Sequence, residues 1–299
     1  MFPLSYLSGN SIGFIRIHIP NIHRGINMAA AALSRLVVKT LNEIRNICGD
    51  FDAIYVMFSG GRDSLVSLDL VLKALDNKMV QALFIDTGIG TPGLKEYVIE
   101  MSKYYNVKLN VVGPEYDFFD LVEKKGFPMI KYRWCKDYLK IRPLKRFIES
   151  IKEKTNKILL ITGVRADESW FKSKAFKIYD HPILNVKVYT PIFEWSSKDV
   201  RKYIEAYNLR ENPLYQTYGK AYDCWCTVFK SPADFALLAI NHPDFFQMFA
   251  DAEAKLKSGG SALYYDGKKI YLRDIAKNPW EYLKKYPINR SCPFCKLLI

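Results

Sequence analysis

The sequence predicts an α/β protein in which helices cover both faces of a parallel sheet, followed by a smaller, mostly helical C-terminal subdomain. Two observations predict this class. Short apolar runs alternate along the chain with longer stretches that have helical spacing. The strand-like runs are almost wholly apolar, which is typical of parallel strands that are buried on both faces.

The first half of the chain supplies three of the expected strands. In order, the pattern predicts a helix over Ala29–Ile47, a strand over Ala53–Phe58, a helix over Ser64–Leu75, and strands over Gln81–Asp86 and Val107–Val112. Thr91 and Pro92 have the residue types of an N-cap and a first helical position. A helix is therefore expected to begin there and to run to Tyr105.

The second half continues the alternation. An amphipathic stretch over Asp137–Lys154 predicts a helix that Pro143 kinks or divides. Further strands are expected over Lys157–Thr162 and Lys187–Pro191. Ser196 and Asp199 have the spacing of a capping box, with Asp in place of the usual Glu or Gln, and this predicts a helix to Tyr207.

Composition divides the chain into three parts. Residues 1–27 are rich in Gly, Ser and Asn and poorly patterned, so we expect an N-terminal extension, disordered and without a role in the fold. The sequence leaves open whether they belong to the natural chain. Residues 28–211 form the expected α/β domain. Aromatic, proline and basic residues increase from residue 212, which predicts a basic, Cys-containing subdomain over 212–299.

The charge of the chain is concentrated in two segments. The formal net charge is +13 over 299 residues. Residues 131–157 carry ten Lys and Arg against three Asp and Glu, and residues 253–299 carry ten against four. Such segments either form a solvated face or attract phosphate-rich partners such as nucleotides or RNA, and the sequence leaves both open. No apolar run reaches the ~20 residues that cross a bilayer, so no membrane partner is expected.

The cysteines are few and partly paired. Four of the six form two close pairs, Cys224 with Cys226 and Cys292 with Cys295. Few cysteines are typical of a reduced, cytoplasmic protein, and close pairs in such a protein indicate metal or redox chemistry more than structural disulfides. Cys48 lies on the first helix and is expected in the core.

The most informative stretch joins the first strand to the next helix: Ser59-Gly60-Gly61-Arg62-Asp63-Ser64, called the glycine turn below. Ligands of parallel sheets bind at the carboxyl ends of the strands. The glycines allow close approach of a ligand to the backbone, and the N–H groups at the start of the helix suit a phosphate. Ser59 and Ser64 add hydroxyl donors, and Arg62 adds charge. The Walker A and dinucleotide-binding patterns are both absent. The turn therefore predicts a phosphate cradle of another kind.

The glycine turn matches in full the Ser-Gly-Gly-x-Asp-Ser signature of the PP-loop family, the adenine nucleotide alpha-hydrolases. Within that superfamily the chain is most similar to the phosphoadenosine phosphosulfate (PAPS) reductase-like group. Further segments carry the resemblance, which spans about residues 51–230: Phe84–Gly88, Arg133–Leu144, Thr162–Ser169, and Asn212–Tyr215 followed by Cys224 and Cys226.

The resemblance implies a Rossmann-like core that binds ATP or a sulfonucleotide (PAPS or APS) at the glycine turn. It implies that Asp63 positions Mg²⁺ and that Asp86, Thr87 and Gly163 border the same crevice. Asp86 would meet a ribose hydroxyl or Mg²⁺, unless it only caps the next segment.

Arg165 is the expected holder of the transferred group. It follows a strand and a glycine, where a guanidinium would bind phosphate or sulfate. The alternative is an ion pair with Asp167 or Glu168. Asp63, Arg165 and Cys135 are the expected catalytic residues.

The paired cysteines have three interpretations. Cys135, Cys224 and Cys226, with Cys292 or Cys295, would bind a [4Fe–4S] cluster, as in related sulfonucleotide reductases and tRNA-thiolating PP-loop enzymes. The same thiolates would otherwise hold a structural zinc ion. As a third interpretation they are redox-active or buried thiols. The sequence leaves these open.

The resemblance implies an enzyme that cleaves an adenine nucleotide at its alpha-phosphate during sulfur transfer. Asp63 favours ATP with Mg²⁺, because PAPS reductases usually lack this acid, and this chain lacks their Cys-Gly-x-His tail. Adenylation of an acceptor, followed by sulfur insertion from an unidentified donor, is the favoured reaction. Reduction of PAPS or APS to sulfite is the alternative. An alternative of another class is a non-catalytic module that binds tRNA or a nucleotide. An enzyme that thiolates tRNA would combine catalysis with tRNA binding. The sequence leaves open whether the chain forms a homodimer.

Overall fold

The computed structural model describes residues 28–76, 79–155, 157–168, 176–256 and 259–288. The predictions made for residues 1–27, for Ser169, and for Cys292 and Cys295 therefore lie outside the described residues. No helix in the described ranges is long and apolar enough to cross a membrane.

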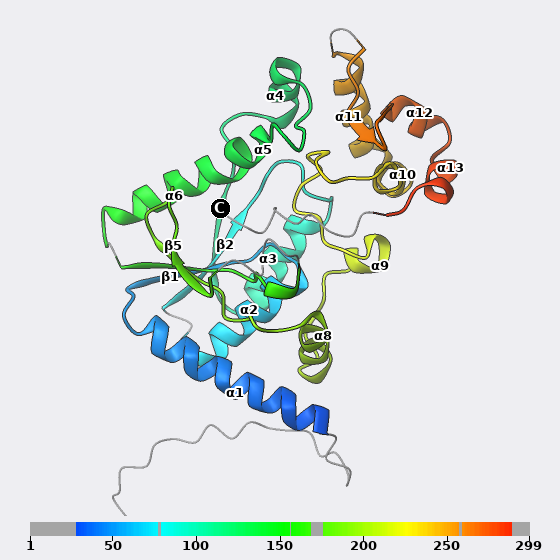
Figure 1. Cartoon of the computed structure of the whole chain (residues 1–299). Helices are drawn as coiled ribbons and strands as arrows, with labels where there is room; N and C mark the ends of the chain where they lie inside the picture. Colours follow the sequence, from blue (N-terminus) through cyan, green and yellow to red (C-terminus); the bar gives the residue numbers. More distant parts are fainter. Residues whose placement is uncertain (1–27, 77–78, 156, 169–175, 257–258, 289–299) are drawn as a thin grey trace, which may run out of the picture.

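A six-stranded sheet forms the centre of the molecule (Figure 1). The strands lie in the order β3-β2-β1-β4-β6-β5. Their bounds are β1 Ala53–Met57, β2 Val80–Ile85, β3 Lys108–Val112, β4 Ile158–Ile161, β5 Ile178–Asp180 and β6 Lys187–Tyr189. Neighbours pair in parallel, except that β5 is antiparallel to β6. The predicted parallel α/β sheet is confirmed, and the antiparallel edge strand β5 is an addition that the sequence analysis missed.

The central strands are apolar because both faces of the sheet are covered. Ile54 of β1 pairs with Val80 on one side and with Leu159 on the other. Successive side chains of a strand point to opposite faces. Accordingly, Val56 belongs to one buried cluster and its neighbour Tyr55 to another.

Helices lie on both sides of the sheet (Figure 1). One face is covered by α1 (Met28–Cys48), α2 (Arg62–Ala74), α3 (Leu94–Tyr104) and α8 (Ser197–Ala206). The other face is covered by α6 (Arg142–Lys152), which buries Leu144 and Ile148 against β1, β2 and β4. The capping box of Ser196 and Asp199 that starts α8 is confirmed.

The predicted helix start at Thr91 is wrong. Helix α3 begins at Leu94, and its N-cap is Gly93 with a φ of 88°. The Thr91 hydroxyl instead donates to the Tyr222 carbonyl at 3.1 Å and accepts the Trp225 indole N–H at 3.0 Å. Thr91 thus makes a tertiary contact with a distant loop and does not cap the helix. The residues around Thr91 in the sequence give no sign of that contact.

The predicted division of the 137–154 stretch is confirmed. A short α5 (Trp134–Lys136) leads into the π-helix η1 (Asp137–Ile141), and α6 follows with Pro143 in its first turn. Proline has no N–H to donate and disturbs the preceding turn, and a π-turn at this place accommodates both effects.

A second core lies beyond the sheet and combines two parts of the chain. It joins α4 (Phe118–Lys125) and α5 to later elements. These are α9 (Leu214–Tyr218), α10 (Pro232–Asn241), α11 (Pro243–Ala254), α12 (Leu272–Lys277) and α13 (Pro279–Lys285), with a hairpin of β7 (Leu263–Tyr265) and β8 (Lys268–Ile270). Phe118 and Phe119 therefore pack against Phe249 across the expected boundary at residue 212, with ring centroids 5.9 Å and 5.0 Å apart. The boundary itself stays a prediction.

Candidate functional site

The glycine turn connects β1 to α2 at the carboxyl edge of the sheet. Gly60 has a φ of 77°, which L side chains rarely adopt, and a Cβ there would lie 2.7 Å from Leu94 Cδ1. The Asn212 amide donates to the Gly60 carbonyl at 3.2 Å. The hydroxyl oxygens of Ser59 and Ser64 lie 3.2 Å apart. The turn is therefore held in one conformation by contacts from α3 and from the 212 region.

Gly163 supports the turn from the neighbouring strand. It follows β4, and a Cβ added to it would lie 2.7 Å from the carbonyl carbon of Asp63 and 2.8 Å from the amide nitrogen of Ser64. Backbone atoms cannot move aside as the end of a flexible side chain can. The end of β4 and the first turn of α2 consequently meet backbone to backbone, and this contact requires glycine.

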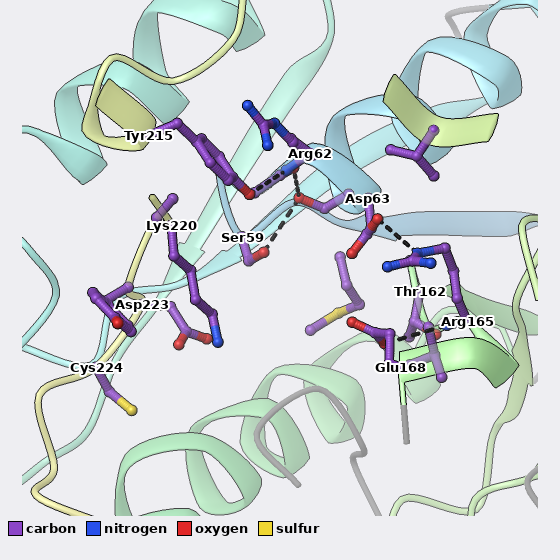
Figure 2. A pocket seen from close by; sticks show the side chains of 18 of the residues that line it. Ser59, Arg62, Asp63, Thr162, Arg165, Glu168, Tyr215, Lys220, Asp223 and Cys224 are labelled. Atoms are coloured by element: carbon purple, nitrogen blue, oxygen red, sulfur yellow. Dashed lines mark hydrogen bonds and ion pairs between the residues drawn. The ribbon is translucent and has the colours of Figure 1, made fainter. Parts of the chain in front are cut away.

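A cavity of about 540 Å³ opens beside the turn, within the ~300–1,000 Å³ typical of small-molecule sites. Its other walls come from β1 and β2, from the 162–168 loop after β4, from α8 and from residues 215–230. Figure 2 shows side chains of this lining. Eight of the residues predicted from the sequence line this cavity: Ser59, Gly61, Arg62, Asp63, Ser64, Gly163, Arg165 and Cys224.

Arg165 lies between acidic side chains at one end of the cavity. Its Nε donates to Asp63 Oδ1 at 2.9 Å, and its Nη1 donates to Asp167. The backbone N–H of Arg165 donates to Glu168 Oε2 at 3.3 Å. Glu168 belongs to the 3₁₀ turn η2 (Ala166–Glu168). We call Asp63, Asp167 and Glu168 around Arg165 the acidic end. The ion pair with Asp167 that was given as the alternative for Arg165 is present, and binding of a transferred group by Arg165 stays a prediction. The pair with Asp63 is an addition that sequence reasoning did not foresee.

Arg62 is held by residues of the 211–215 segment. Its guanidinium forms an ion pair with Glu211 and stacks on the Tyr215 ring at 4.0 Å. Burial opposes the charge of Arg62, but the hydrogen bond to Glu211 and the attraction to Glu211, Tyr215 and Asp63 together raise the pKa of Arg62. The Arg62 N–H also donates to the Tyr215 hydroxyl at 2.9 Å. Glu211 therefore compensates the charge that Arg62 was expected to add.

Asp86 and Thr87 lie at the same sheet edge but not in the cavity wall. Asp86 pairs with Lys95 at 2.8 Å and accepts the Gly88 N–H at 3.1 Å, so the capping role given as its alternative is present. The Thr87 hydroxyl donates to the Asp223 carbonyl at 2.7 Å. A contact of Asp86 or Thr87 with a nucleotide stays a prediction.

Three of the predicted ligand cysteines come together next to the cavity. Cys135, Cys224 and Cys226 are buried in the second core, and the Sγ atoms of Cys224 and Cys226 lie 3.5 Å apart. Of these three, Cys224 lines the cavity, whereas the expected catalytic residue Cys135 does not. Hydrogen bonding to Cys226, with burial, raises the pKa of Cys224 well above its usual value. Hydrogen bonding to Cys135, with burial, raises the pKa of Cys226 to about 12.

The described thiols do not by themselves fit a metal centre. Within the residues that the structure describes, no group of three His, Cys, Asp or Glu side chains is arranged to hold a metal ion. Cys292 and Cys295, the other predicted ligands, lie outside those residues. An iron–sulfur cluster or a zinc ion therefore has no part in the reaction proposed below. Mg²⁺ requires fewer protein ligands, because one or two carboxylates together with substrate phosphates and water can coordinate it. Asp63, at the glycine turn, fits that requirement.

The opposite end of the cavity holds residues that sequence reasoning missed. Lys140 and Asp223 form an ion pair with an N–O distance of 2.6 Å, and Lys220 and Lys230 line the same wall. Burial opposes both charges of the pair, but mutual attraction raises the pKa of Lys140 and lowers the pKa of Asp223. Lys140 and Asp223 are 83 residues apart, so no local pattern pointed to their pairing.

The fold and the site define the class of this protein. A mostly parallel sheet, a Ser-Gly-Gly-x-Asp-Ser turn at its carboxyl edge and a cavity beside that turn are the marks of a PP-loop protein. Residues 53–228 match the phosphoadenosine phosphosulfate reductase domain, and the chain belongs to this family.

Individual relatives agree with the family. An uncharacterized protein of Methanocaldococcus jannaschii is 36% identical over 172 residues, which are 57% of this chain and 34% of that protein. An adenosine 5'-phosphosulfate reductase of Anoxybacillus flavithermus is 26% identical over 166 residues, 55% of this chain and 67% of that enzyme. The crystal structure of a PAPS reductase from Candida auris has a TM-score of 0.50 and 20% identity, covering 72% of this chain and 98% of that one. The chain spans between a third and a half of the length of the two Methanocaldococcus jannaschii relatives that it matches.

Proposed function

We propose that this chain is an enzyme that binds an adenine nucleotide with its phosphates on the glycine turn and cleaves at the alpha-phosphate in sulfur transfer. One observation carries the proposal. The backbone of the turn is fixed against Gly163, and Gly61, Arg62, Asp63 and Ser64 of the turn line a cavity of about 540 Å³. A rigid turn with N–H groups at the start of a helix is suited to phosphate because its donors need no rearrangement.

In the reaction we favour, ATP adenylates an acceptor oxygen and releases pyrophosphate, and a sulfur donor then displaces AMP. The N–H groups of the glycine turn, with Ser59 and Ser64, would bind the phosphates. Asp63 would hold Mg²⁺, which neutralises phosphate charge when bound. Arg165 would hold the transferred group after exchanging its carboxylate partners for it.

The acidic end favours ATP with Mg²⁺ over a metal-free sulfonucleotide. Its three carboxylates line the same cavity as the glycine turn, and Arg165 pairs with two of them, Asp63 and Asp167. Carboxylates next to phosphates repel them unless a cation lies between. Reduction of PAPS or APS to sulfite is the alternative, and it is supported by the family and by the names of the reductase relatives.

Two measurements on the full chain separate these reactions. Calorimetric titration with ATP should give binding that requires Mg²⁺, and Asp63→Asn should weaken it by about 10-fold or more, since a charge-assisted contact is lost. Asp50→Asn, at an exposed carboxylate, is the matched control. Pyrophosphate release from ATP would support adenylation, and sulfite release from APS or PAPS would support reduction. If neither nucleotide bound, the proposal would be wrong.

Binding of tRNA is the second candidate, and the two basic segments favour it. In the first segment, however, Arg142, Lys145 and Arg146 are paired with Asp137, Glu149 and Glu115. This pairing reduces the charge that the segment offers to a phosphate backbone. Gel-shift titration with tRNA at rising salt would test the candidate, because contacts with several phosphates produce a steep loss of affinity with salt.

A further inference from the structure

The cavity has two ends of opposite charge. The acidic end lies next to the glycine turn. The other end, called the lysine end, is formed by Lys140, Lys220, Lys230, Asp223 and Cys224. It therefore places three ammonium groups near one carboxylate, whereas the acidic end places three carboxylates near one guanidinium. Figure 2 shows Lys220, Asp223 and Cys224 across the cavity from Arg165 and Glu168.

All three lysines act on the same carboxylate. Lys140 contacts Asp223 directly at 2.6 Å. The ammonium groups of Lys220 and Lys230 lie 5.4 Å and 3.6 Å from the ring centroid of Tyr222, the residue before Asp223. Lys140, Lys220, Lys230 and Asp223 all line the same cavity. One carboxylate is thus shared among three cations.

Like charges gathered in a cavity repel one another more strongly than they would in water, because the local dielectric constant is lower. An anion that enters the lysine end would relieve this repulsion and would receive charge-assisted hydrogen bonds. The charges at this end therefore select an anion, in the same way that the acidic end selects a cation or a cation-bound phosphate.

The loop that carries Lys230 is held in a strained conformation. Thr227 and Phe229 have φ angles of 65° and 60°, which are unusual for residues other than glycine. The Thr227 hydroxyl donates to the Pro128 carbonyl at 3.1 Å, and Lys230 N–H donates to the Thr227 carbonyl at 3.0 Å. Strain of this kind persists only where the surroundings fix it, and it is common at ligand sites. The backbone of the loop at Lys230 is consequently held by contacts within the chain itself.

We propose that the lysine end is a second anion site, which binds a sulfur oxyanion of the thiosulfate or sulfate type independently of the nucleotide. The presence of an anion site follows from the charges at this end. The choice of a sulfur oxyanion rests on the proposed function and on Cys224, whose thiol lines the same wall. The two sites lie in one cavity, so a nucleotide at the glycine turn and the sulfur compound would be bound together.

Lys220→Met and Lys230→Met test the proposal in the full chain. Lys140 is left intact, because its loss would leave Asp223 buried without its direct partner. Sodium thiosulfate is titrated by calorimetry at an ionic strength held constant with sodium chloride, with and without ATP and Mg²⁺. Each variant should weaken thiosulfate binding by about 10-fold or more, and should change ATP binding by less than about 2-fold. Lys277→Met, at a lysine whose side chain is 77% exposed, should change neither.

Three results would overturn the proposal. The first is thiosulfate affinity that is equal in the wild-type chain and both variants. The second is competition between ATP and thiosulfate, which would place the anion at the glycine turn. The third is a pair of observations: neither thiosulfate nor sulfate binds, and Lys220→Met and Lys230→Met weaken the binding of APS. The lysine end would then bind a group of the nucleotide itself. A chain that bound thiosulfate through these lysines but bound no nucleotide would keep the second site and refute the proposed function.

Discussion

Gly163→Ala is the sharpest test of how the glycine turn is held. The new Cβ would lie 2.7 Å from the Asp63 carbonyl carbon and 2.8 Å from the Ser64 amide nitrogen, whereas ordinary contact begins near 3.4 Å. The end of β4 and the start of α2 must therefore separate by roughly half an ångström or more, and overpacking of this kind costs about 1–3 kcal/mol of stability. The N–H groups of the turn would move with α2. Loss of one charge-assisted hydrogen bond would weaken ATP binding by roughly 10- to 100-fold.

Two other glycines separate the effect on folding from the effect on binding. A Cβ at Gly61 would lie 3.5 Å from the Tyr215 hydroxyl and 3.6 Å from Ser59 Oγ, so the fold has room for it. It would nevertheless stand on the cavity wall where the phosphates are expected. Gly61→Ala should therefore keep the free energy of unfolding within about 0.5 kcal/mol while weakening ATP binding. Gly49→Ala, whose Cβ would lie 3.5 Å from the Arg45 carbonyl oxygen, should change neither quantity.

Urea unfolding followed by circular dichroism measures the stability of the three variants, and calorimetric titration with ATP and Mg²⁺ measures binding. Reduced stability together with reduced binding is expected for Gly163→Ala, and reduced binding alone for Gly61→Ala. Wild-type stability and wild-type ATP affinity in Gly163→Ala would refute the inference that this backbone contact fixes the turn.

Two further predictions concern buried groups away from the cavity. Burial raises the pKa of Cys48 to about 12, so its thiol stays protonated at pH 8. Because the thiolate is the reactive form, iodoacetamide should label Cys48 at least ~10³-fold more slowly in the native chain than in the unfolded chain. Mass spectrometry measures the two labelling rates. The thiol loses its proton near pH 9 in the unfolded chain but not in the folded chain. The free energy of unfolding should therefore fall as the pH rises from 9 toward 12, and Cys48→Ala should remove the contribution of Cys48 to this fall. Rapid labelling of native Cys48 at pH 8 would contradict the prediction. Buried Glu253 accepts the N–H groups of Ala262 and Leu272 at 2.8 and 2.7 Å, and Glu253→Ala should cost roughly 2–5 kcal/mol by leaving two buried donors unpaired. Glu281→Ala, at an exposed carboxylate, is its control, and equal urea midpoints for the two variants would show that the Glu253 contacts do not stabilise the fold.

Much of the fold was predictable because it depends on local pattern. The apolar run that forms β1 and the helical spacing after it report burial on both faces of a sheet, whatever the rest of the chain does. The same holds for the place of the glycine turn between β1 and α2, which follows from adjacent residues, whereas the conformation of the turn also depends on Gly163 and Asn212. Short strands such as β5 and β7 were missed, because three residues carry too little periodicity to be recognised.

A parallel α/β core with a PP-loop signature at the end of its first strand could be predicted from the order of the residues alone. The surroundings of that signature depend on how distant parts of the chain fold together. Arg165 meets Asp63 across 102 residues of sequence, and Lys140 meets Asp223 across 83. Cys224 lines the cavity, and Cys135, the expected catalytic residue, does not. The physical reason is that periodicity reports which side chains are buried, whereas the pairing of charges depends on which distant loops reach the same edge of the sheet.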